Sequence, residues 1–260
     1  MPELPEVETF ARYFARHALL QRIARVEVLD ERILGEIRKE TFVRKLRGRT
    51  FTAVRRHGKH LFANAGTLWL HLHFGMSGDL TYTRERELPR FARVVFHFEG
   101  GARLAFEDMR LFGVADLVED PAAFIRERGL GPDPLDRSFT SRRFAALLEG
   151  RRGAFKSLLM TQEILAGLGN LYVDETLYQT GIHPRRPVDR LTAAEVRAVF
   201  TTIRRILRAA LTRHARQVEL PGTYLFHHRE EGERCPRCPG TIRRSVVFGR
   251  TTYFCSRHQR

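Results

Sequence analysis

The sequence has few cysteines and no long hydrophobic run. Only 3 cysteines occur in 260 residues, and all of them follow residue 234. A disulfide framework normally uses an even number of cysteines spread along a secreted chain, so clustered thiols favour a metal site. No apolar segment approaches the roughly 20 residues needed to cross a membrane. The start MPELPEVETF lacks the basic and apolar regions of a signal peptide. We therefore expect a cytoplasmic protein without a membrane partner.

Acidic side chains are in the minority. The chain has 45 Lys and Arg against 30 Asp and Glu, which gives a formal net charge of +15. Neutralising phosphates with such cations releases counterions, so the excess favours a polyanionic partner. A basic surface that serves solubility would give the same count, and charge alone therefore favours nucleic acid only modestly. The hydrophobic fraction of 43% is enough for a packed core.

The first half of the chain combines one helix with several strands. Val7, Phe10, Phe14 and Ala18 recur at helical spacing and predict an amphipathic helix near the amino terminus. The period then changes to two, which predicts strands over residues 23–28, 51–55, 68–74, 93–98 and 103–106. This pattern indicates a β-sandwich or barrel with an accessory helix.

The second half is predicted to be helical after a break rich in glycine and proline at residues 129–134. Short helices are predicted over residues 141–148, 155–160, 162–165 and 170–179, the last two flanking the turn at residues 166–169. Thr192 and Glu195 form a capping box that opens a longer helix, whose apolar face runs from Val196 to Ala210.

The carboxyl-terminal segment has the spacing of a metal-binding knuckle. Cys235 and Cys238 form one pair, and Cys255 and His258 form a second. Two ligands separated by two residues can share one tight turn, and two such pairs predict a closed, structural tetrahedral zinc site. The segment between the pairs predicts a hairpin. Because His258 lies near the end of the chain, two other histidines remain candidates for the fourth position, namely His227 and His228.

The amino terminus offers a second kind of chemistry. If Met1 is removed, Pro2 becomes a secondary amine whose pKa lies near about 8, so a useful fraction is nucleophilic at neutral pH. Attack of this amine on C1′ of a nucleotide would give a cationic iminium, which promotes elimination of the strand phosphates. Glu3 is a neighbouring proton-transfer group. Taken alone, the segment is equally an ordinary amino-terminal turn.

Several ordered motifs resemble those of the formamidopyrimidine-DNA glycosylase and endonuclease VIII family. The resemblance begins with MPELPEVET and continues through RRHGK (55–59), HFGMSG (73–78), DMRLFG (108–113), AGLGNLY (166–172) and the terminal knuckle. It implies an α+β multidomain fold. The implied parts are an N-terminal catalytic β-sandwich domain with flanking helices (1–118), a linker (119–135), a helix–two-turn–helix DNA-binding domain (136–228) and a zinc finger hairpin (229–260).

The resemblance implies roles for individual residues. The implied catalytic residues are Pro2, Glu3 and Lys59, and the implied zinc ligands are Cys235, Cys238, Cys255 and His258. Excision requires the damaged base to leave the stack, and other groups must fill the gap. The implied DNA-binding residues are Met76, Arg110 and Phe112 for this gap and Lys156, Asn170 and Arg250 for phosphates. Without the resemblance, Phe112 would be interpreted as a core residue and Lys59 as a surface lysine. Met76 could also be a core residue, but its place in a glycine-flanked turn favours an exposed tip.

The sequence departs from the family pattern in three places. Residues 217–233 are shorter than the segment that covers 8-oxoguanine in the purine-specific branch, and they look more like the endonuclease VIII branch. Leu111 replaces a common arginine, and His258 replaces the usual fourth cysteine. Glu6 matches a family carboxylate, although capping of the first helix is an equally good interpretation.

The expected function is therefore a bifunctional DNA glycosylase and abasic-site lyase. It would excise oxidised bases by imine formation at Pro2, followed by β- and δ-elimination. We expect one structural Zn²⁺, a partner of double-stranded DNA with oxidised bases or abasic sites, a monomer, and a location at the nucleoid. Two alternatives remain: a lyase restricted to abasic sites, and a non-catalytic protein that binds DNA damage.

Overall fold

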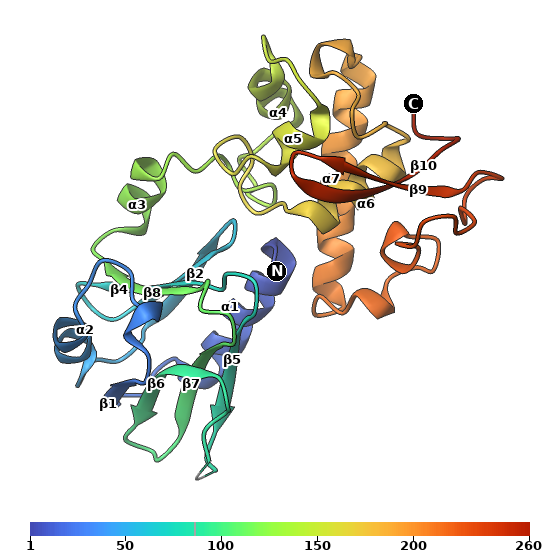
Figure 1. The fold of residues 1–260 in the computed structure, drawn as a ribbon. Helices are drawn as coiled ribbons and strands as arrows, with labels where there is room; N and C mark the ends of the chain where they lie inside the picture. Colours follow the sequence, from blue (N-terminus) through green and yellow to red (C-terminus); the bar gives the residue numbers. More distant parts are fainter. Residues whose placement is uncertain (86) are drawn as a thin grey trace. The chain divides into compact units, whose positions relative to one another are not determined.

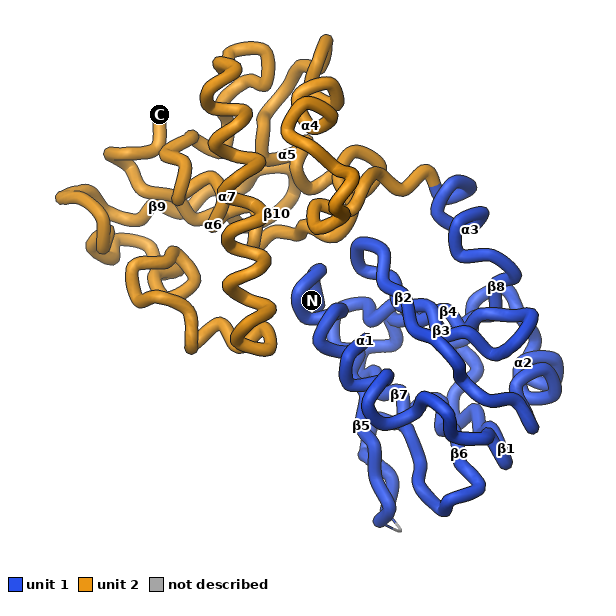
Figure 2. Tube along the Cα trace, turned by 180° about the vertical axis from the view of Figure 1, so that it is seen from behind, with its two compact units in different colours: residues 1–128 blue, residues 129–260 orange. Residues whose placement is uncertain are grey.

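The computed structural model describes residues 1–85 and 87–260, which divide into two compact units (Figures 1 and 2). The first unit covers residues 1–128 and contains the sheets, whereas the second covers residues 129–260 and contains most of the helices and a β-hairpin. The predicted α+β class is confirmed. Helix α3 (Pro121–Glu127) occupies part of the expected linker and belongs to the first unit. The four-part domain division stays a prediction. No helix among the described residues is long and apolar enough to cross a membrane.

The first unit contains two antiparallel four-stranded sheets. One has the order β1 (Ile23–Val28), β6 (Ala92–Phe98), β7 (Arg103–Asp108), β5 (Gly78–Thr83). The other has the order β2 (Ala53–His57), β3 (His60–Asn64), β4 (Trp69–His73), β8 (Val114–Val118). Each strand predicted from the sequence corresponds to an observed strand. Strands β3, β5 and β8 were not predicted. Strands β3 and β8 lack a clean alternation of apolar and polar residues, whereas β5 alternates over residues 79–83 and was overlooked.

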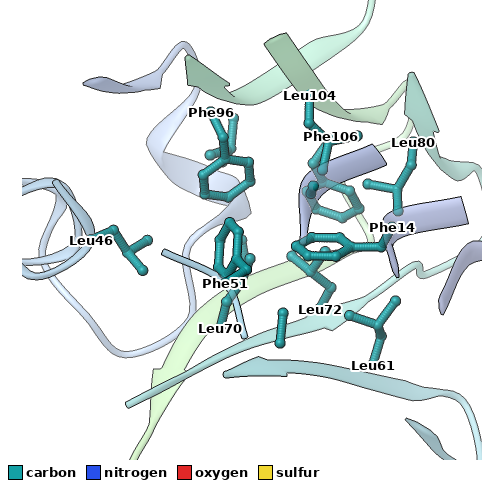
Figure 3. Packing of buried hydrophobic residues seen from close by; sticks show 14 of the residues in the cluster. Phe14, Leu46, Phe51, Leu61, Leu70, Leu72, Leu80, Phe96, Leu104 and Phe106 are labelled. Carbon is teal, nitrogen blue, oxygen red and sulfur yellow. The ribbon is translucent and has the colours of Figure 1, made fainter. Parts of the chain in front are cut away.

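The core of the first unit lies between the two sheets (Figure 3). Helix α1 (Leu4–Ala18) buries Phe14 in this core, where its ring packs edge-on against Phe51 with ring centroids 5.0 Å apart. Phe51 in turn packs against Phe96 of β6. Helix α2 (Lys39–Leu46) and the short 3-10 helix η1 (Glu31–Ile33) close the rest of this core. The predicted amphipathic helix is thus confirmed, and its apolar face joins the two sheets.

The second unit contains four helices and a hairpin among the described residues. They are α4 (Ser141–Leu148), α5 (Phe155–Met160), α6 (Asn170–Thr180), α7 (Ala193–Thr212), β9 (Ile242–Val247) and β10 (Arg250–Cys255), with the 3-10 helices η2 (Val188–Arg190), η3 (Gln217–Glu219) and η4 (Leu225–His227). The predicted capping box is present, since Thr192 Oγ1 accepts from the backbone N–H of Glu195 at 3.2 Å.

The short helix predicted over residues 162–165 is wrong, because this segment is a turn. The Gln162 side chain explains the difference. Its amide donates to the carbonyl of Leu168 at 2.8 Å, and its Oε1 accepts from the backbone N–H of Gly167 at 2.9 Å. These bonds offer the backbone partners other than those of a helix. Helix α6 begins directly after this turn.

A histidine cluster lies on one face of the β3–β4 pair. His60 Nδ1 lies 2.9 Å from Nε2 of His71, and the rings of both pack against Phe124 of α3. The Nδ1 atom of His71 is buried and has no hydrogen-bond partner. Burial lowers the pKa of His60 and His71, and the neighbouring His57, His73 and Arg128 lower the pKa of His60 further. Both imidazoles are therefore neutral in the folded protein at neutral pH.

This burial predicts acid sensitivity of the first unit. Because the folded pKa values are depressed, the unfolded chain binds more protons, and stability is lost as the pH falls below the unfolded value of about 6.5. Each histidine should lower the free energy of unfolding by up to about 1.4 kcal/mol per pH unit between about pH 6 and pH 4. The fluorescence of Trp69, the single tryptophan, would follow urea denaturation of this unit.

In the His60→Tyr/His71→Val double variant, the pH dependence of the unfolding free energy should become shallower than in the parent chain. The matched control is His214→Asn, which replaces an exposed histidine of the second unit. An equal pH slope in the double variant and the parent would contradict this account.

Candidate functional site

The amino terminus leads directly into helix α1. Glu3 is the residue before the helix, and its carboxyl-bearing side chain is buried, with only 3% of the residue exposed. The backbone N–H of Glu3 donates to Glu6 Oε2 at 3.0 Å, so the capping interpretation of Glu6 is confirmed. Met1 is exposed, and Pro2 is partly exposed. Once Met1 is removed, the amine of Pro2 would stand next to a buried carboxyl group.

Lys59 occupies the turn between β2 and β3, and it is largely buried. Arg56 fixes this turn to α1. Its Nε donates to Glu8 Oε2 at 2.9 Å, and its Nη1 donates to the carbonyl of Gly58 at 3.1 Å. Gly58 has a φ of +54°, which suits glycine in so tight a turn. The turn that carries Lys59 is therefore held against the helix that begins just after Pro2 and Glu3.

His73 is a neighbour of Lys59 that the sequence did not single out. Burial lowers the pKa of His73, and the positive charge of Lys59 lowers it further. The Nδ1 atom of His73 accepts from the backbone N–H of Gly75 at 3.3 Å. His73 thereby links the surroundings of Lys59 to the loop that carries Met76. The only feature of the sequence that could have indicated a role for His73 is its position at the start of the HFGMSG motif.

Two adjacent loops of the first unit present Met76, Arg110 and Phe112, which we call the loop cluster. Met76 follows β4, and the other two residues lie between β7 and β8. Met76 is 40% exposed and Phe112 is 55% exposed, so neither is a core residue. The guanidinium of Arg110 lies over the Phe112 ring at 4.9 Å from its centroid. The structure thus brings all three side chains to neighbouring loops at the surface of this unit.

The buried carboxylate of Asp108 holds these two loops together. Its Oδ1 accepts from Ser77 Oγ at 2.5 Å and from the backbone N–H of Arg110 at 3.0 Å. Its Oδ2 accepts from the backbone N–H of Gly113 at 2.6 Å. The loops also approach closely, since a Cβ added to Gly75 would lie 2.3 Å from the carbonyl carbon of Phe112. The exposed side chains of the loop cluster are therefore carried by two loops that hydrogen bonds to a buried carboxylate hold together.

The four predicted metal ligands converge in the second unit. The sulfur atoms of Cys235, Cys238 and Cys255 and one ring nitrogen of His258 all lie within 4.8 Å of one another. Cys238 Sγ is 3.4 Å from Cys255 Sγ and 3.4 Å from His258 Nδ1. Ligands at about 2.0–2.3 Å from a tetrahedral ion lie roughly 3.3–3.8 Å apart, so these spacings fit one bound metal ion.

Neighbouring groups orient these ligands. The Nε2 atom of His258 lies 3.1 Å from the carbonyl of Tyr178, an arrangement that makes Nε2 the donor and leaves Nδ1 for the metal. His227 and His228 do not belong to the cluster. The first lies 3.0 Å from the carbonyl of Leu220, and the second contacts Glu233. The structure therefore places His258, and neither of the other two candidates, beside the three thiols.

Lys156 lies inside the second unit. Its ammonium donates to Asn170 Oδ1 at 2.7 Å, to Asp174 Oδ1 at 2.6 Å and to Thr252 Oγ1 at 2.5 Å. Lys156 and Asp174 are both fully buried. Burial raises the pKa of Asp174, and the charges of Lys156 and Arg229 oppose this rise. A direct phosphate contact by Lys156 is not supported, because its three N–H groups donate to protein atoms and join α5, α6 and β10.

Asn170 and Arg250 lie at positions that face solvent at least in part. Asn170 is the first residue of α6, and its Nδ2 donates to the carbonyl of Thr251 at 2.9 Å. Arg250 begins β10 and is exposed. The Lys156–Asn170 contact fixes the orientation of the Asn170 amide at the start of the helix, where backbone N–H groups favour anions.

The short segment at residues 217–233 is folded onto the helices. Leu225 is buried, and Arg205 of α7 donates to the hydroxyl of Tyr224 at 3.0 Å. Glu175 of α6 accepts from the backbone N–H of Phe226 at 3.1 Å. Burial raises the pKa of Glu175 to about 7, against the lowering effect of its hydrogen bonds to Gln179 and to the segment. The segment is therefore ordered by its own contacts, and the sequence did not reveal the role of Glu175.

Family comparisons agree with this arrangement. The model of the formamidopyrimidine-DNA glycosylase N-terminal domain matches residues 1–115, and that of the formamidopyrimidine-DNA glycosylase H2TH domain matches residues 130–221. The formamidopyrimidine-DNA glycosylase of Paracoccus denitrificans is 38% identical over 279 residues and covers 98% of each chain. That of Symbiobacterium thermophilum is 38% identical over 280 residues, which span 100% of this chain and 89% of the relative.

Solved structures of Lactococcus lactis proteins have a similar fold. An FPG variant in complex with a Fapy-dG containing DNA has a TM-score of 0.90, 28% identity and 100% coverage of both chains. A formamidopyrimidine-DNA glycosylase bound non-covalently to an AP site containing DNA has a TM-score of 0.89, 29% identity and 99% coverage of both chains.

The metal cluster predicts that chelation disorders the hairpin of the second unit. Few apolar residues are buried around these ligands, so the binding free energy of the metal should supply much of the local folding free energy. A strong chelator, or the Cys255→Ser substitution, should make residues 229–260 sensitive to proteases and lower the metal content measured by mass spectrometry. Trp69 fluorescence should stay unchanged, because this residue belongs to the first unit.

His227→Gln is the matched control for this experiment, since that histidine lies outside the cluster, and it should keep the metal. An unchanged metal content and unchanged protease resistance in the Cys255→Ser chain would contradict the assignment of the four ligands.

Proposed function

This chain belongs to the formamidopyrimidine-DNA glycosylase family, and we propose that it excises oxidised bases from double-stranded DNA and then cleaves the strand at the resulting abasic site. The observation that carries the proposal is the position of Pro2 at the open end of α1, beside the buried side chain of Glu3. A secondary amine at this position is a nucleophile, and an adjacent carboxyl group can exchange protons with the reacting nucleotide.

The proposed reaction begins at the nitrogen of Pro2 after loss of Met1. Its lone pair forms a bond to C1′ of the extruded nucleotide, and the base leaves with the electron pair of the glycosidic bond and takes up a proton. The Pro2 nitrogen gives up its own proton, so that its lone pair is available again. Opening of the C1′–O4′ bond, with a proton delivered to O4′, then gives a cationic iminium. Glu3 moves these protons, and Lys59, held by its turn against α1, supports the ring opening or the adjacent phosphate.

The iminium accounts for strand cleavage. It acidifies the hydrogen at C2′, and loss of that proton expels the 3′ phosphate in β-elimination. A second elimination expels the 5′ phosphate and leaves a one-nucleotide gap. No external oxidant or reductant is needed, since each step transfers a proton and displaces a leaving group.

The loop cluster is proposed to hold the DNA open. Met76 and Phe112 would enter the space that the extruded base leaves, and Arg110 would bond the orphaned partner base. In the second unit, Asn170 and Arg250 would contact phosphates, and Lys156 would position Asn170 from inside the protein. The formal charge of +15 and the DNA complexes of the Lactococcus lactis proteins support this partner.

The metal is proposed to be one structural Zn²⁺. Three thiolates and one imidazole suit this ion, and four protein ligands leave no open position for a reacting molecule. When bound, the ion supplies folding free energy to the hairpin and takes no part in base excision. A second candidate function is a lyase restricted to abasic sites, which is favoured only by the short segment at residues 217–233.

Borohydride trapping tests the role of Pro2. Protein from which Met1 is confirmed absent should form a covalent complex with duplexes that carry 8-oxoguanine opposite cytosine, dihydrothymine or an abasic site. An uncleaved amino-terminal tag should abolish trapping, because it turns the Pro2 amine into an amide. The same tag at the carboxyl terminus is the control. A complex with abasic DNA alone would favour the restricted lyase, and the absence of any complex would refute the proline mechanism.

The loop cluster predicts a defect that depends on duplex structure. Phe112→Ala should lower kcat/KM on a duplex that contains a damaged base by about tenfold, because stacking of an aromatic ring on a base contributes about 1–3 kcal/mol. Cleavage of a single-stranded abasic oligonucleotide should be unchanged, since that substrate has no stack to fill. Gel assays of both substrates would measure the two effects.

Met109→Ala is the matched control, since Met109 is an exposed residue of the same loop that the proposal leaves out of the gap. Equal losses on duplex and single-stranded substrates in the Phe112→Ala chain would contradict gap filling and indicate damage to the active site.

A further inference from the structure

The tip of the β9–β10 hairpin has an unusual residue in its turn. Strand β9 ends at Val247, strand β10 begins at its partner Arg250, and only Phe248 and Gly249 connect them. Both connecting residues have positive φ, +53° and +65°. Two-residue hairpin turns of this kind strongly prefer Asn-Gly or Gly-Gly, because a bulky side chain is strained in the left-handed region. Phenylalanine at the first position therefore disfavours the turn that it forms.

The same residue is also exposed to solvent. Phe248 is 62% exposed, and the neighbouring Val246 is 61% exposed. By contrast, the other end of the hairpin is buried, with Ile242 and Cys255 in a small core. An apolar group thus occupies the protruding end of a hairpin whose base is held by the metal ligands. Neither strain nor exposure improves folding, so the ring needs another explanation.

Cations lie beside this apolar tip and along the strand that leads to it. Arg250 is the next residue after the turn, whereas Arg243 and Arg244 are exposed nearer the base of β9. Arg185 donates from Nη2 to the carbonyl of Val246 at 2.7 Å, which adds a further positive charge. A ring flanked by arginines fits a surface with apolar faces between phosphates. Duplex DNA has such a surface in its minor groove, where sugars and base edges lie between two phosphate rows.

We infer that Phe248 is a DNA-contacting residue, whose ring packs into the minor groove beside the phosphate bound by Arg250. This inference rests on the proposed function and adds to it an apolar contact from the second unit. Proteins that bind the minor groove often insert apolar side chains there and anchor the flanking phosphates with arginine. The strained turn keeps the ring at the end of the hairpin, where most of its surface is exposed.

The Phe248→Asn variant removes the aromatic ring and should leave the fold of the hairpin intact. Asn-Gly is the pair that such a turn prefers, so this variant should keep or raise the melting temperature and keep its metal. Binding would be measured by fluorescence polarisation with an uncleavable duplex that contains a tetrahydrofuran abasic analogue. We expect Kd to rise about tenfold, because the apolar surface of the ring that is buried against the groove would be lost from the complex. The salt dependence of Kd should be unchanged, because no phosphate contact is lost.

Two further variants sharpen the result. Leu20→Asn is the matched control, because Leu20 of the first unit is also exposed and has a φ of +63°; its Kd should equal that of the parent. Arg250→Gln should weaken binding and reduce the slope of log Kd against log salt by about 0.9. Binding by Phe248→Asn as tight as that of the parent would overturn the inference. Failure of the parent chain to bind the duplex at all would overturn the proposed function as well.

Discussion

The second unit is organised around one buried ion pair, that between Lys156 and Asp174. Their atoms lie 2.6 Å apart, and both side chains are fully removed from solvent. Taking two charges out of water is unfavourable by several kcal/mol, and attraction offsets this only when the remaining donors and acceptors are also satisfied. Here Thr252 and Asn170 accept the other two hydrogen bonds of the Lys156 ammonium. Arg229 and the backbone N–H of Tyr253 donate to the second oxygen of the Asp174 carboxylate.

The partners of this pair come from distant parts of the chain. Lys156 belongs to α5, Asp174 to α6, and Thr252 lies 96 residues beyond the lysine on β10. Replacing a buried ion pair with apolar side chains of similar volume is often neutral or stabilising. We therefore infer that this network serves to hold α6 and the hairpin in one arrangement, with Asn170 at the helix start as one of its members.

The first unit uses a similar arrangement on a smaller scale. Asp108 is a buried carboxylate whose partners are mostly backbone N–H groups of the loops that carry Met76, Arg110 and Phe112. In both units an internal charge orders the backbone around it. The side chains of Met76, Arg110 and Phe112 project from that backbone, and Asp108 bonds to the backbone N–H of Arg110 and not to these side chains, whereas the Asn170 side chain accepts directly from Lys156. In the first unit, therefore, local rigidity and surface chemistry are assigned to different residues.

This separation explains what could be predicted from the sequence. Helix α1, the capping box at Thr192 and the four ligands from Cys235 to His258 follow from local spacing, and all are present. The partners of Lys156 could not be predicted, because they depend on contacts between residues far apart in the chain. For the same reason the burial of Lys156 could not be predicted, and its role as a phosphate-binding residue stays a prediction that its three internal hydrogen bonds do not support.

The missed secondary structure has a related cause. Strand β3 has buried residues at three successive positions, Leu61, Phe62 and Ala63, because both of its faces are covered. One face is covered by the histidine cluster and Phe124. The alternation of apolar and polar residues along the sequence does not indicate this contact. The turn at residues 162–165 depends instead on one glutamine side chain, and a window of hydrophobicity does not register such bonds.

The hairpin of the second unit combines these elements along one short path. The metal ligands lie at and beyond the base of the hairpin, and the turn at Phe248 and Gly249 forms its far end. Between them, Lys156 donates a hydrogen bond to Thr252 of β10. Each strand has 6 residues, which span about 20 Å at roughly 3.3 Å per residue. Disorder at the base of a hairpin of this length would also displace the residues at its tip. A bound metal ion would therefore help to determine where Arg250 and Phe248 lie without touching either residue, and we propose that it supports DNA recognition while taking no part in the reaction.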